Sequence, residues 1–502
     1  MSLESYFAQY RENIIGQNQA FIGPYGEKEL LYADWTASGR LYRPIEEKMT
    51  ELVAPFIGNT HSESNITGGL MTQAYHRAHQ IIKQHVNAGP DDVIITAGAG
   101  MTAVINKLQR ILGLRIPEQL RPYVNFPKEL KPVVFVTHME HHSNQTSWLE
   151  TIADVIVIPP TANGLVDTQF LRNELPKYAD RTMRIGAFTA CSNVTGICTP
   201  YQELARIMHD YNGFCFVDFA ASAPYVDIDM HPAGDPDARL DAVYFSPHKF
   251  LGGPGTSGVL IFNSKLYSNT APDEPGGGTV KWTNPWGKHS FINDIEAREA
   301  GGTPGFLQAI RTAMCIELKE SIGTDKMLER EEELVPRAFA ALRRIPGMNI
   351  MADSHEQRLG IISFHVDGIH YNQIVRLLND RYGIQVRGGC SCAGTYGHYL
   401  LHLDPERSRS IMATLEEGDQ TLRPGWVRLS VHPTMSDADL DRITDAIAEV
   451  VENIEEWSKD YTYDLRTNEF VHNEKKNVYE EVVNGWFSTE ITADTATPFV
   501  CR

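Results

Sequence analysis

The 502-residue sequence is poor in cysteine and in basic residues. Its seven cysteines are sparse and odd in number, which argues against a disulfide framework and favours a reducing compartment, with the cytosol as the default. Its 45 Lys and Arg residues face 64 Asp and Glu residues, which gives a formal net charge of −19. Nucleic acids and anionic membranes are bound by basic surfaces, so this balance argues against either as a partner.

Long apolar runs are also missing. No window approaches the roughly 18 uninterrupted apolar residues of a membrane-spanning helix. The amino-terminal stretch MSLESYFAQY lacks the basic segment and the apolar core of a secretory signal. With 42% apolar and 22% charged residues, the composition is typical of a globular enzyme or binding protein that buries a sizeable core.

The first two thirds of the chain alternate short apolar, β-branched runs with helical periodicity. These runs cover residues 92–96, 133–137, 184–190, 214–219, 241–246 and 257–262. Continuous apolar strands that alternate with helices predict an α/β fold with a mostly parallel sheet covered on both faces. Ligands of such sheets collect at the carboxyl ends of the strands, so the residues that follow each run are the candidates for chemistry.

Past Gly323 the pattern changes. A charged helical stretch over 326–345 leads into apolar runs at 360–366 and 426–431 and helical stretches at 370–383 and 437–457. This α+β rhythm predicts a smaller carboxy-terminal domain. We therefore expect an amino-terminal segment that packs with the small domain, a large domain, the small domain and a polar extension, over residues 1–30, 31–325, 326–457 and 458–502 respectively.

The strongest single motif is SPHKFLGGPGTSGVLIF, which begins at Ser246. Lys249 follows an apolar strand, has a histidine and a serine beside it, and precedes a run of glycines. An arbitrary lysine is usually a solvated surface residue. The position of this one between a strand and a glycine-rich turn favours desolvation, which makes an amine a good Schiff-base former.

A second motif, AGAGMTAVINKLQRI from Ala97, places a glycine-rich turn between a strand and a helix. Free N–H groups at such a helix start form an anion site, and phosphate is the natural guest. The motif has neither the Walker A lysine nor the GxGxxG spacing, and the same pattern also occurs as a simple tight turn.

Three further strand ends carry polar residues. Asp218 in FCFVDFAAS needs a cationic or hydrogen-bonded partner if it is buried, because an isolated buried charge is costly. The segment THMEHHSN offers His138, His141 and His142 either as metal ligands or, more simply, as a ring that stacks on a ligand; no Cys or Asp pair with zinc spacing accompanies them. Asn193 lies in ACSNVTG.

An amine nucleophile, a phosphate-binding helix start, a buried carboxylate and an imidazole that can stack are together the requirements of a pyridoxal 5'-phosphate (PLP) site. The carboxylate holds a proton on the pyridine nitrogen, which keeps the ring an electron sink, while the lysine forms the Schiff base. Each feature alone is weak. Their conjunction at the strand ends of one sheet predicts a PLP enzyme.

These residues resemble the class V aminotransferase group of PLP enzymes, and within it the cysteine desulfurase branch of the SufS type. The resemblance runs from about Leu31 to Glu449, through YADWTAS, GNTHSES, GMT, MEHHSN, SNVTG, VDFAAS, SPHK, REAGGTPG, VRGGCSCAG and WVRLSV in chain order. It implies the PLP-dependent transferase fold type I, with a seven-stranded, mostly parallel sheet in the large domain. It also implies a homodimer whose sites are shared across the interface.

The resemblance assigns roles to individual residues. The residues that it implies for cofactor binding are Met101, Thr102, His141, Asn193, Asp218, Ser246, His248, Lys249 and Thr303. Among them, His141 stacks on the ring and Thr303 reaches the phosphate of the partner subunit. The residues implied on the substrate side are His61, Arg387 and Arg428, and the last two offer guanidinium groups that fit a carboxylate.

The loop VRGGCSCAG decides the activity. In the desulfurases a loop of the form RTGxxCA carries the nucleophilic thiol, and Cys392, followed by Ala393, aligns with it. The catalytic residues implied are therefore Lys249, Cys392 and His141. Cys390 could resolve a persulfide, relay sulfur or fill space, and we favour a non-catalytic loop cysteine.

Several positions depart from the family pattern. Ala221 stands where the family has a glutamine that bonds the phenolic oxygen of the cofactor, and Gly388 replaces the threonine after the loop arginine. The segment 394–425 and the chain after 458 are longer than the branch requires. The sequence therefore predicts a cytoplasmic desulfurase that makes L-alanine and a persulfide on Cys392 and passes sulfur to an acceptor. The alternatives are an aminotransferase, an epimerase or a C–S lyase on the same fold, and more remotely a non-enzymatic scaffold.

Overall fold

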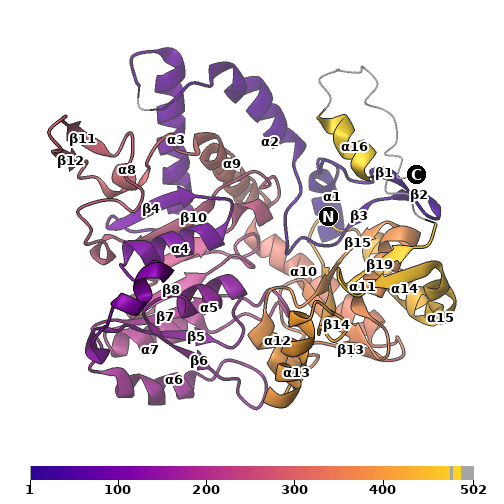
Figure 1. Ribbon diagram of the computed structural model, residues 1–502. Helices are drawn as coiled ribbons and strands as arrows, with labels where there is room; N and C mark the ends of the chain where they lie inside the picture. The colour runs from indigo at the N-terminus through magenta and orange to yellow at the C-terminus, as the bar shows by residue number, and fades with distance from the viewer. Residues whose placement is uncertain (1, 61, 475–478, 488–502) are drawn as a thin grey trace. The chain divides into compact units, whose positions relative to one another are not determined.

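The chain folds into two units, each with its own sheet. The structure is a computed structural model that describes residues 2–60, 62–474 and 479–487. The large unit comprises Ala37–Asn193 and Ile197–Leu328 (Figure 1). The small unit comprises the chain up to Thr36, the short stretch Val194–Gly196 and the chain from Glu329 onward.

The large unit is built on a seven-stranded sheet in the order β4-β10-β9-β8-β7-β5-β6. Its strands are β4 (Asp92–Ala97), β5 (Val133–Thr137), β6 (Asp154–Ile158), β7 (Arg184–Thr189), β8 (Phe214–Asp218), β9 (Ala242–Phe245) and β10 (Gly258–Asn263). Only β10 runs antiparallel to its neighbours. The predicted mostly parallel, seven-stranded α/β sheet is confirmed.

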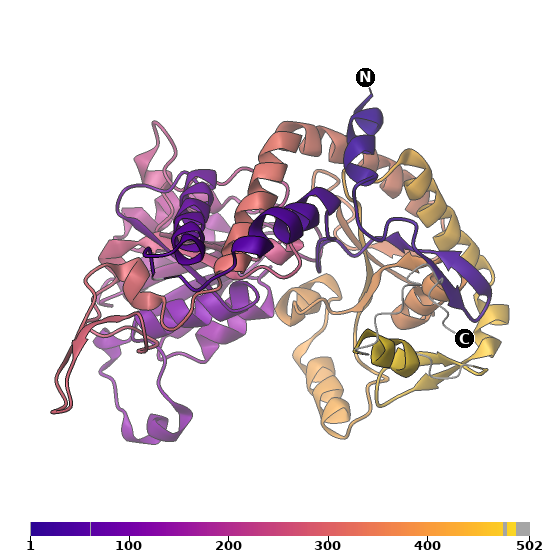
Figure 2. The same cartoon turned by 90° about the horizontal axis from the view of Figure 1, so that it is seen from above.

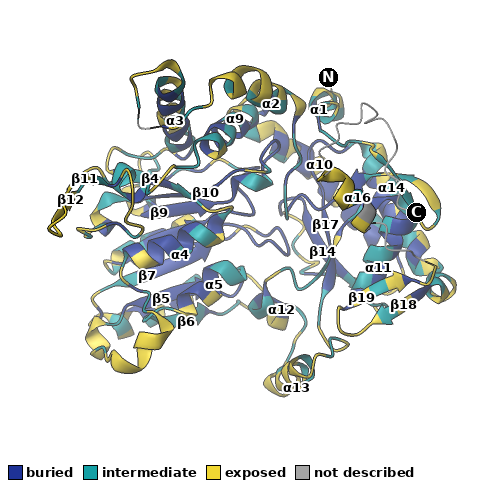
Figure 3. Ribbon diagram, turned by 45° about the horizontal axis from the view of Figure 1, so that its top comes forward, coloured by how far each residue is buried: buried dark blue, intermediate teal, exposed yellow. Residues whose placement is uncertain are grey.

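The six predicted apolar runs form β4 at one edge of this sheet and the five interior strands. All five residues of β5 are buried, and Figure 3 shows the strands of the large unit as its buried layer. Strand β6 was not among the six predicted runs. It lies at one edge of the sheet and most of its residues are only half-buried, although its sequence DVIVI is as apolar as the predicted runs.

Helices cover the sheet and connect its strands. They are α2 (Arg43–Glu47), α3 (Ile66–His85), α4 (Met101–Ile111), α5 (His142–Leu149), α6 (Thr168–Glu174), α7 (Tyr201–Asp210), α8 (Ile295–Glu299) and α9 (Phe306–Ile322). The buried face of α4 packs into an apolar cluster with Trp148, Phe216 and Tyr244. Figure 2 shows the hairpin of β11 (Val280–Thr283) and β12 (His289–Phe291) extending from the body of this unit.

The small unit has an antiparallel sheet in the order β13-β14-β17-β16. Its strands are β13 (Met348–Ile350), β14 (Ile361–Val366), β16 (Arg387–Gly389) and β17 (Trp426–Ser430). Its helices are α1 (Leu3–Arg11), α10 (Thr324–Leu342, from Glu329), α11 (Tyr371–Leu377), α12 (Gly394–Leu400), α13 (Pro405–Glu416), α14 (Asp437–Glu452), α15 (Ile454–Trp457) and α16 (Tyr479–Trp486).

Three two-stranded ladders complete the small unit. They pair β1 (Ala20–Gly23) with β2 (Gly26–Glu29), β3 (Leu31–Tyr32) with β15 (Ile384–Gln385), and β18 (Tyr461–Asp464) with β19 (Glu469–His472). The parallel β3–β15 ladder fixes the amino-terminal segment to this unit just before Asp34. Within the described ranges, no helix is long and apolar enough to cross a membrane.

Candidate active site

The start of helix α4, where the sequence predicts an anion site, follows the end of β4. The turn between them uses Gly98 at a φ of +57°, a conformation that disfavours a side chain. The backbone N–H of Met101 donates to Ser246 Oγ at 2.9 Å. A Cβ atom on Gly100 would lie 3.2 Å from Ser246 Oγ and 3.5 Å from the ring of His248. The helix start and the end of β9 therefore enclose a tight cradle of donors suited to a phosphate.

A second wall of this cradle comes from α5. Thr102 Oγ1 lies 2.7 Å from Ser143 Oγ, so the hydroxyl predicted to hold phosphate is exposed at the point where α4 and α5 approach. His141 is the N-cap residue of α5, and its Nδ1 accepts the N–H of Ser143 at 3.1 Å. Because Nδ1 accepts, we assign the ring proton to Nε2. The cap thus fixes the orientation of the imidazole that is predicted to stack.

Lys249 lies on a single turn of 3-10 helix, Pro247–Lys249, directly after β9. The N–H of Gly39 donates to the carbonyl of His248 at 2.9 Å. A Cβ atom at position 39 would come within 1.9 Å of the carbonyl oxygen of Phe250, so only glycine allows this approach. Gly39 thereby holds the lysine turn in place.

His248 lies beside Lys249 and is neutral at physiological pH. Burial, with a further contribution from the charge of Lys249, lowers the pKa of His248 to about 4. A neutral imidazole can donate one hydrogen bond from a ring N–H without adding a charge next to the lysine. This matches the predicted role of His248 as a phosphate ligand.

Asp218 ends strand β8 and is 3% exposed. Its Oδ1 accepts the N–H of Ala220 at 2.8 Å. Burial raises the pKa of Asp218 to about 6, although this hydrogen bond and the charge of Lys249 both lower it. A cationic N–H partner would stabilise the ionised form of this buried carboxylate, which burial disfavours.

Glu140 is a second buried carboxylate in this region, and the sequence reasoning missed it. Its Oε1 accepts from the backbone N–H of Thr137 and Thr189, and its Oε2 accepts from Asn144 Nδ2 at 2.7 Å. Burial raises the pKa of Glu140 to about 8, and the charge of Asp218 contributes. Glu140 ties β5, α5 and β7 together beneath His141. The signal for it was an acidic residue inside an otherwise buried strand end.

The remaining predicted residues of the large unit differ in exposure. Asn193 is buried after β7, whereas Thr303 is exposed in the loop between α8 and α9. His61 lies outside the described residues. Ala221 is buried, and the hydroxyl of the adjacent Ser222 is also buried, with no hydrogen-bond partner among the described residues. The structure therefore brings together Met101, Thr102, His141, Ser246, His248 and Lys249. For Thr303 it shows no hydrogen bond or ion pair to any other residue that it describes.

The two predicted arginines lie directly opposite each other in the small unit, on β16 and β17. Asp34 bridges them: its Oδ2 accepts Arg387 Nε at 2.9 Å, and its Oδ1 accepts Arg428 Nη2 at 3.0 Å. The side chain of Arg428 is 4% exposed and that of Arg387 is 52% exposed. Two guanidinium groups share one carboxylate, so the cluster keeps a surplus positive charge that suits the carboxylate of an amino acid.

Asp34 was not identified from the sequence, although it lies in the YADWTAS motif. Its neighbours are anchored to β17, because Thr36 N donates to Ser430 Oγ at 3.1 Å and Trp35 stacks on His432 with ring centroids 3.7 Å apart. These contacts fix the motif so that the Asp34 carboxylate binds both arginines.

The thiol loop leads from β16 to α12. Cys392 is exposed and Cys390 is half-buried, and both are free thiols. Ser391 and Cys392 both adopt positive φ angles, 52° and 55°, which non-glycine residues rarely do. Trp426 Nε1 donates to Ser391 Oγ at 3.1 Å and holds the turn against β17. Electrostatic interaction links Cys392 to Arg428, so the exposed thiol shares the small unit with the arginine pair.

The metal alternative for the histidine-rich segment finds no support in the geometry. His138 is buried with a lowered pKa of about 4, and its Nε2 lies 3.2 Å from the carbonyl of Gly164. Over the described part of the chain, no three His, Cys, Asp or Glu residues group so as to hold a metal ion.

The family model described as aminotransferase class-V matches residues 31–443. The chain belongs to the class V aminotransferase family. Enzymes of this family depend on PLP, so the predicted enzyme class and cofactor are confirmed. The match spans both units, from the strand before Asp34 to helix α14.

Curated relatives and solved structures agree with this assignment. The chain is 28% identical over 368 residues to a protein of Halalkalibacterium halodurans named "Probable cysteine desulfurase", covering 72% of this chain and 84% of that one. A protein of Staphylococcus aureus Mu50 with the same name is 28% identical over 401 residues, with coverages of 79% and 91%.

Two solved structures share the fold. The apo cysteine desulfurase of Thermococcus onnurineus NA1 superposes with a TM-score of 0.69 at 22% identity, covering 89% of this chain and 98% of that chain. The Escherichia coli cysteine desulfurase in its S-sulfonic acid form gives a TM-score of 0.66 at 23% identity with the same coverages. The predicted fold is confirmed.

The residues of the large unit fit PLP. Gly100 keeps the space beside Ser246 and His248 free of a side chain, because a Cβ atom there would lie only 3.2 Å from Ser246 Oγ, and the N–H of Met101 points to the same oxygen. Asp218 has a raised pKa that a pyridinium N–H would lower, because an opposite charge stabilises the carboxylate. Lys249 would hold the aldehyde and His141 would lie on the ring. When bound, PLP supplies an electron sink for charge that develops on the substrate carbon.

Asp218 makes the stability of the cofactor-free protein depend on pH. Its folded-state pKa of about 6 exceeds the ordinary value of 3.8, so the folded state holds the proton more tightly and its stability falls as pH rises. Between pH 5 and pH 8 we expect the free energy of unfolding of the wild type to fall by about 1 to 2 kcal/mol more than that of Asp218→Asn. Urea denaturation of both cofactor-free proteins measures this, and parallel pH profiles would contradict it.

Proposed function

We propose that this protein is a cysteine desulfurase that converts L-cysteine to L-alanine and carries the removed sulfur as a persulfide on Cys392. The observation that carries the proposal is the exposed Cys392 thiol on a constrained turn, in the same unit as the Asp34–Arg387–Arg428 cluster. The curated relatives named "Probable cysteine desulfurase" support the same activity.

The arginine cluster is assigned to the substrate carboxylate. Arg428 is buried, and burial together with the charge of Arg387 lowers its pKa, although Asp34 raises it. An amino-acid carboxylate would relieve the repulsion between the two guanidinium groups as Asp34 does. Arg387, which is half-exposed, would receive the carboxylate first, and Arg428 would fix its orientation.

Sulfur leaves the substrate by thiol attack. The Cys392 thiolate attacks the γ-sulfur of the substrate, the C–S bond breaks, and the bonding pair returns to the substrate carbon. A proton then replaces sulfur on that carbon, which gives L-alanine, and a new S–S bond gives the persulfide on Cys392. We assign Lys249 to two tasks: it holds the cofactor, and it moves the proton at the substrate Cα.

The test is stoichiometric. The purified protein with PLP is mixed with one equivalent of L-cysteine per subunit, without any reductant. We expect about one L-alanine and one sulfane sulfur per subunit, with the sulfur on the thiol loop that contains Cys392, located by alkylation and peptide mass spectrometry. Pyruvate or ammonia in place of alanine would exclude the desulfurase reaction, and so would alanine without a persulfide.

Exchanging the buried guanidinium for an ammonium should impair substrate binding. In Arg428→Lys the bidentate fork is lost, and the bond to Asp34 is weakened. We expect KM for L-cysteine to rise by about 10- to 100-fold with a smaller change in kcat. Steady-state kinetics measure this, with Arg409→Lys on exposed α13 as the control. A fall in kcat at constant KM would contradict the assignment.

A second candidate is another PLP reaction on an amino acid, namely transamination, epimerisation or C–S lysis. Buried Ala221 favours it, because this position provides no side-chain donor to the phenolic oxygen of the cofactor. A panel of L- and D-amino acids, scored by spectral change and product, separates the reactions. Keto acid or racemised product without alanine would favour this candidate.

Quaternary structure and location complete the proposal. We propose a homodimer in which Thr303 reaches the phosphate of the partner's site, a sulfur acceptor downstream, and a cytoplasmic location. The exposed Thr303 loop supports the dimer, and so do Trp282 and Trp286 in the β11–β12 hairpin, which are 69% and 84% exposed. The six cysteines described are all free, which suits a reducing compartment. Light scattering of the wild type and of Trp286→Ala tests the dimer.

A further inference from the structure

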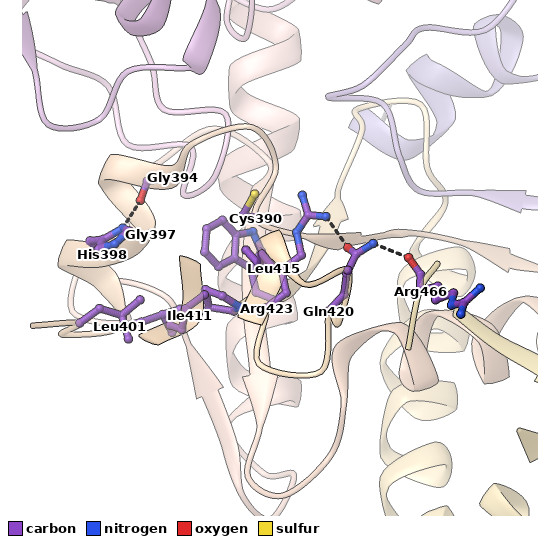
Figure 4. A pocket seen from close by; sticks show the side chains of 14 residues that line it. Cys390, Gly394, Gly397, His398, Leu401, Ile411, Leu415, Gln420, Arg423 and Arg466 are labelled. Carbon is purple, nitrogen blue, oxygen red and sulfur yellow. Dashed lines mark hydrogen bonds between the residues drawn. The ribbon is translucent and has the colours of Figure 1, made fainter. Parts of the chain in front are cut away.

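Two segments that exceed the family pattern pack together in the small unit. These are the inserted segment 394–425 and the hairpin β18–β19 in the chain after 458. Gln420 joins them: its backbone N–H donates to the carbonyl of Leu465 at 2.9 Å, and its Nε2 donates to the carbonyl of Arg466 at 2.6 Å. Figure 4 shows Gln420 between Arg423 and Arg466. The two additions therefore form one structure.

The inserted segment is internally fixed. His398 on α12 has its Nδ1 2.7 Å from the carbonyl of Gly394 and its Nε2 2.8 Å from Ser408 Oγ on α13. Helix α13 begins with Asp404, whose side chain accepts the N–H of Arg407, and with Pro405 in the first turn. The contact between His398 and Ser408 thus fixes α13 against α12.

These elements enclose a cavity of about 480 Å³. Its apolar lining comes from Leu401, Leu403, Ile411, Leu415, Pro424 and Trp426, and its polar lining includes His398, Gln420, Arg423 and Arg466. A volume of this size suits a small molecule rather than a folded protein domain.

Cys390 also lines this cavity, whereas Cys392 does not. The turn between the two thiols is held by the bond from Trp426 to Ser391, and Trp426 itself is fully buried. One thiol therefore borders the cavity, and the other is exposed on the same turn and interacts with Arg428. Ser391 is the single residue between the two thiols in the sequence.

The polar rim of the cavity is basic. Arg423 Nη1 donates to Gln420 Oε1 at 2.7 Å, and Arg466 follows on the hairpin. Two carboxylates lie near these arginines in the sequence: Asp419 accepts the N–H and hydroxyl of Thr421, and Asp464 accepts the N–H of Arg466 at 2.9 Å. Neither carboxylate belongs to the cavity lining. In a chain with a net charge of −19, two arginines in the lining of a largely apolar cavity favour an anionic guest.

We propose that this cavity is the site at which sulfur leaves the enzyme, that Cys390 relays the sulfur, and that the occupant is a small anionic thiol. The proposal rests on the proposed desulfurase function. The Cys390 thiolate attacks the outer sulfur of the Cys392 persulfide, the S–S bond breaks, and the electron pair stays on Cys392 as a thiolate. The thiolate of the acceptor then takes the outer sulfur from Cys390 in the same way, so no net oxidation or reduction occurs.

The first test compares three thiols at equal thiolate concentration: anionic 2-mercaptoethanesulfonate, neutral 2-mercaptoethanol and cationic cysteamine. With saturating L-cysteine we expect kcat/KM to be about tenfold higher for the sulfonate than for the neutral thiol, the size of one charge-assisted hydrogen bond, and lowest for cysteamine. Arg423→Gln should remove the preference. Equal rates for all three thiols in the wild type would overturn the proposal. That result would favour a peptide of an acceptor protein as the occupant of the cavity.

Filling the cavity tests its location. Ile411→Trp should reduce kcat/KM for the sulfonate about tenfold, whereas Met412→Trp, on the same helix but 56% exposed and outside the lining, should match the wild type. If Ile411→Trp destabilises the fold, its thermal midpoint will be lower than that of Met412→Trp. In that case the loss of the thiol preference in Arg423→Gln is the deciding test. Equal effects of the two tryptophan substitutions in equally stable proteins would contradict the site.

The position of the sulfur separates this proposal from the desulfurase function itself. After one turnover without a thiol acceptor, peptide mass spectrometry should find sulfane sulfur on both Cys390 and Cys392. In Cys390→Ser it should be trapped on Cys392, and steady-state turnover with the sulfonate should fall about tenfold. Sulfur found on Cys392 alone in the wild type would overturn only the relay. Failure to find it on either cysteine, together with absence of alanine, would instead reject the desulfurase function.

Discussion

Lys249→Ala should abolish turnover and remove the covalent attachment of the cofactor. The lysine sits on a turn fixed by Gly39 and next to neutral His248, so no other amine in that turn can replace it. We expect activity to fall by at least about 10⁴-fold, because the variant loses both the Schiff base and the group that moves the Cα proton. The visible absorbance of bound PLP should be lost, and borohydride should trap no adduct in the variant.

The control for this experiment is Lys265→Ala, an exposed lysine after β10 in the same unit. It should keep the absorbance, the borohydride adduct on residue 249 and full activity. A wild-type protein that is colourless with added PLP and yields no adduct at residue 249 would contradict the cofactor assignment. An adduct on a different lysine would contradict the role of this side chain alone.

Cys392→Ser should abolish sulfur transfer while the cofactor remains bound. A hydroxyl cannot form a persulfide, and Cys392 is the exposed thiol on the loop that the arginine pair adjoins. We expect release of sulfide from L-cysteine, measured with excess dithiothreitol, to fall by at least about 10³-fold. The PLP spectrum and its change on adding L-cysteine should persist, because the residues that hold cofactor and substrate carboxylate are unchanged.

Cys198→Ser is the matched control, because Cys198 is also exposed and free but lies outside the thiol loop. It should retain activity. Full sulfide release by Cys392→Ser would mean that the substrate loses sulfur without thiol attack, as a C–S lyase does. Loss in both variants would mean that the effect is not specific to the loop.

The strand ends explain why much of the site was predictable. Lys249, Asp218 and the start of α4 each follow a buried apolar run, and a parallel sheet brings such ends to one edge. The edge strand β6 was missed although its run DVIVI is as apolar as the others, whereas β4 at the opposite edge was predicted. Local pattern therefore identified strands one by one but not their order in the sheet, which depends on pairing between remote segments.

Partners that are distant in sequence were not predictable. Asp34 meets Arg387 and Arg428 across more than 350 positions, and Gln420 meets the β18–β19 turn 46 positions away. Glu140 was hidden for another reason: a buried carboxylate is recognised by its donors, and those come from β5, α5 and β7 together. A pattern in one segment contains no information on which donors another segment brings.

The family and the cofactor follow from the sequence alone, because each motif is local and its residue types are set by the reaction. The tertiary structure alone decided that one carboxylate joins the two arginines, that Asp218 has a raised pKa, and that the inserted segment and the hairpin enclose a cavity at Cys390. These properties arise from burial and from contacts between remote segments, and both exist only once the chain has folded.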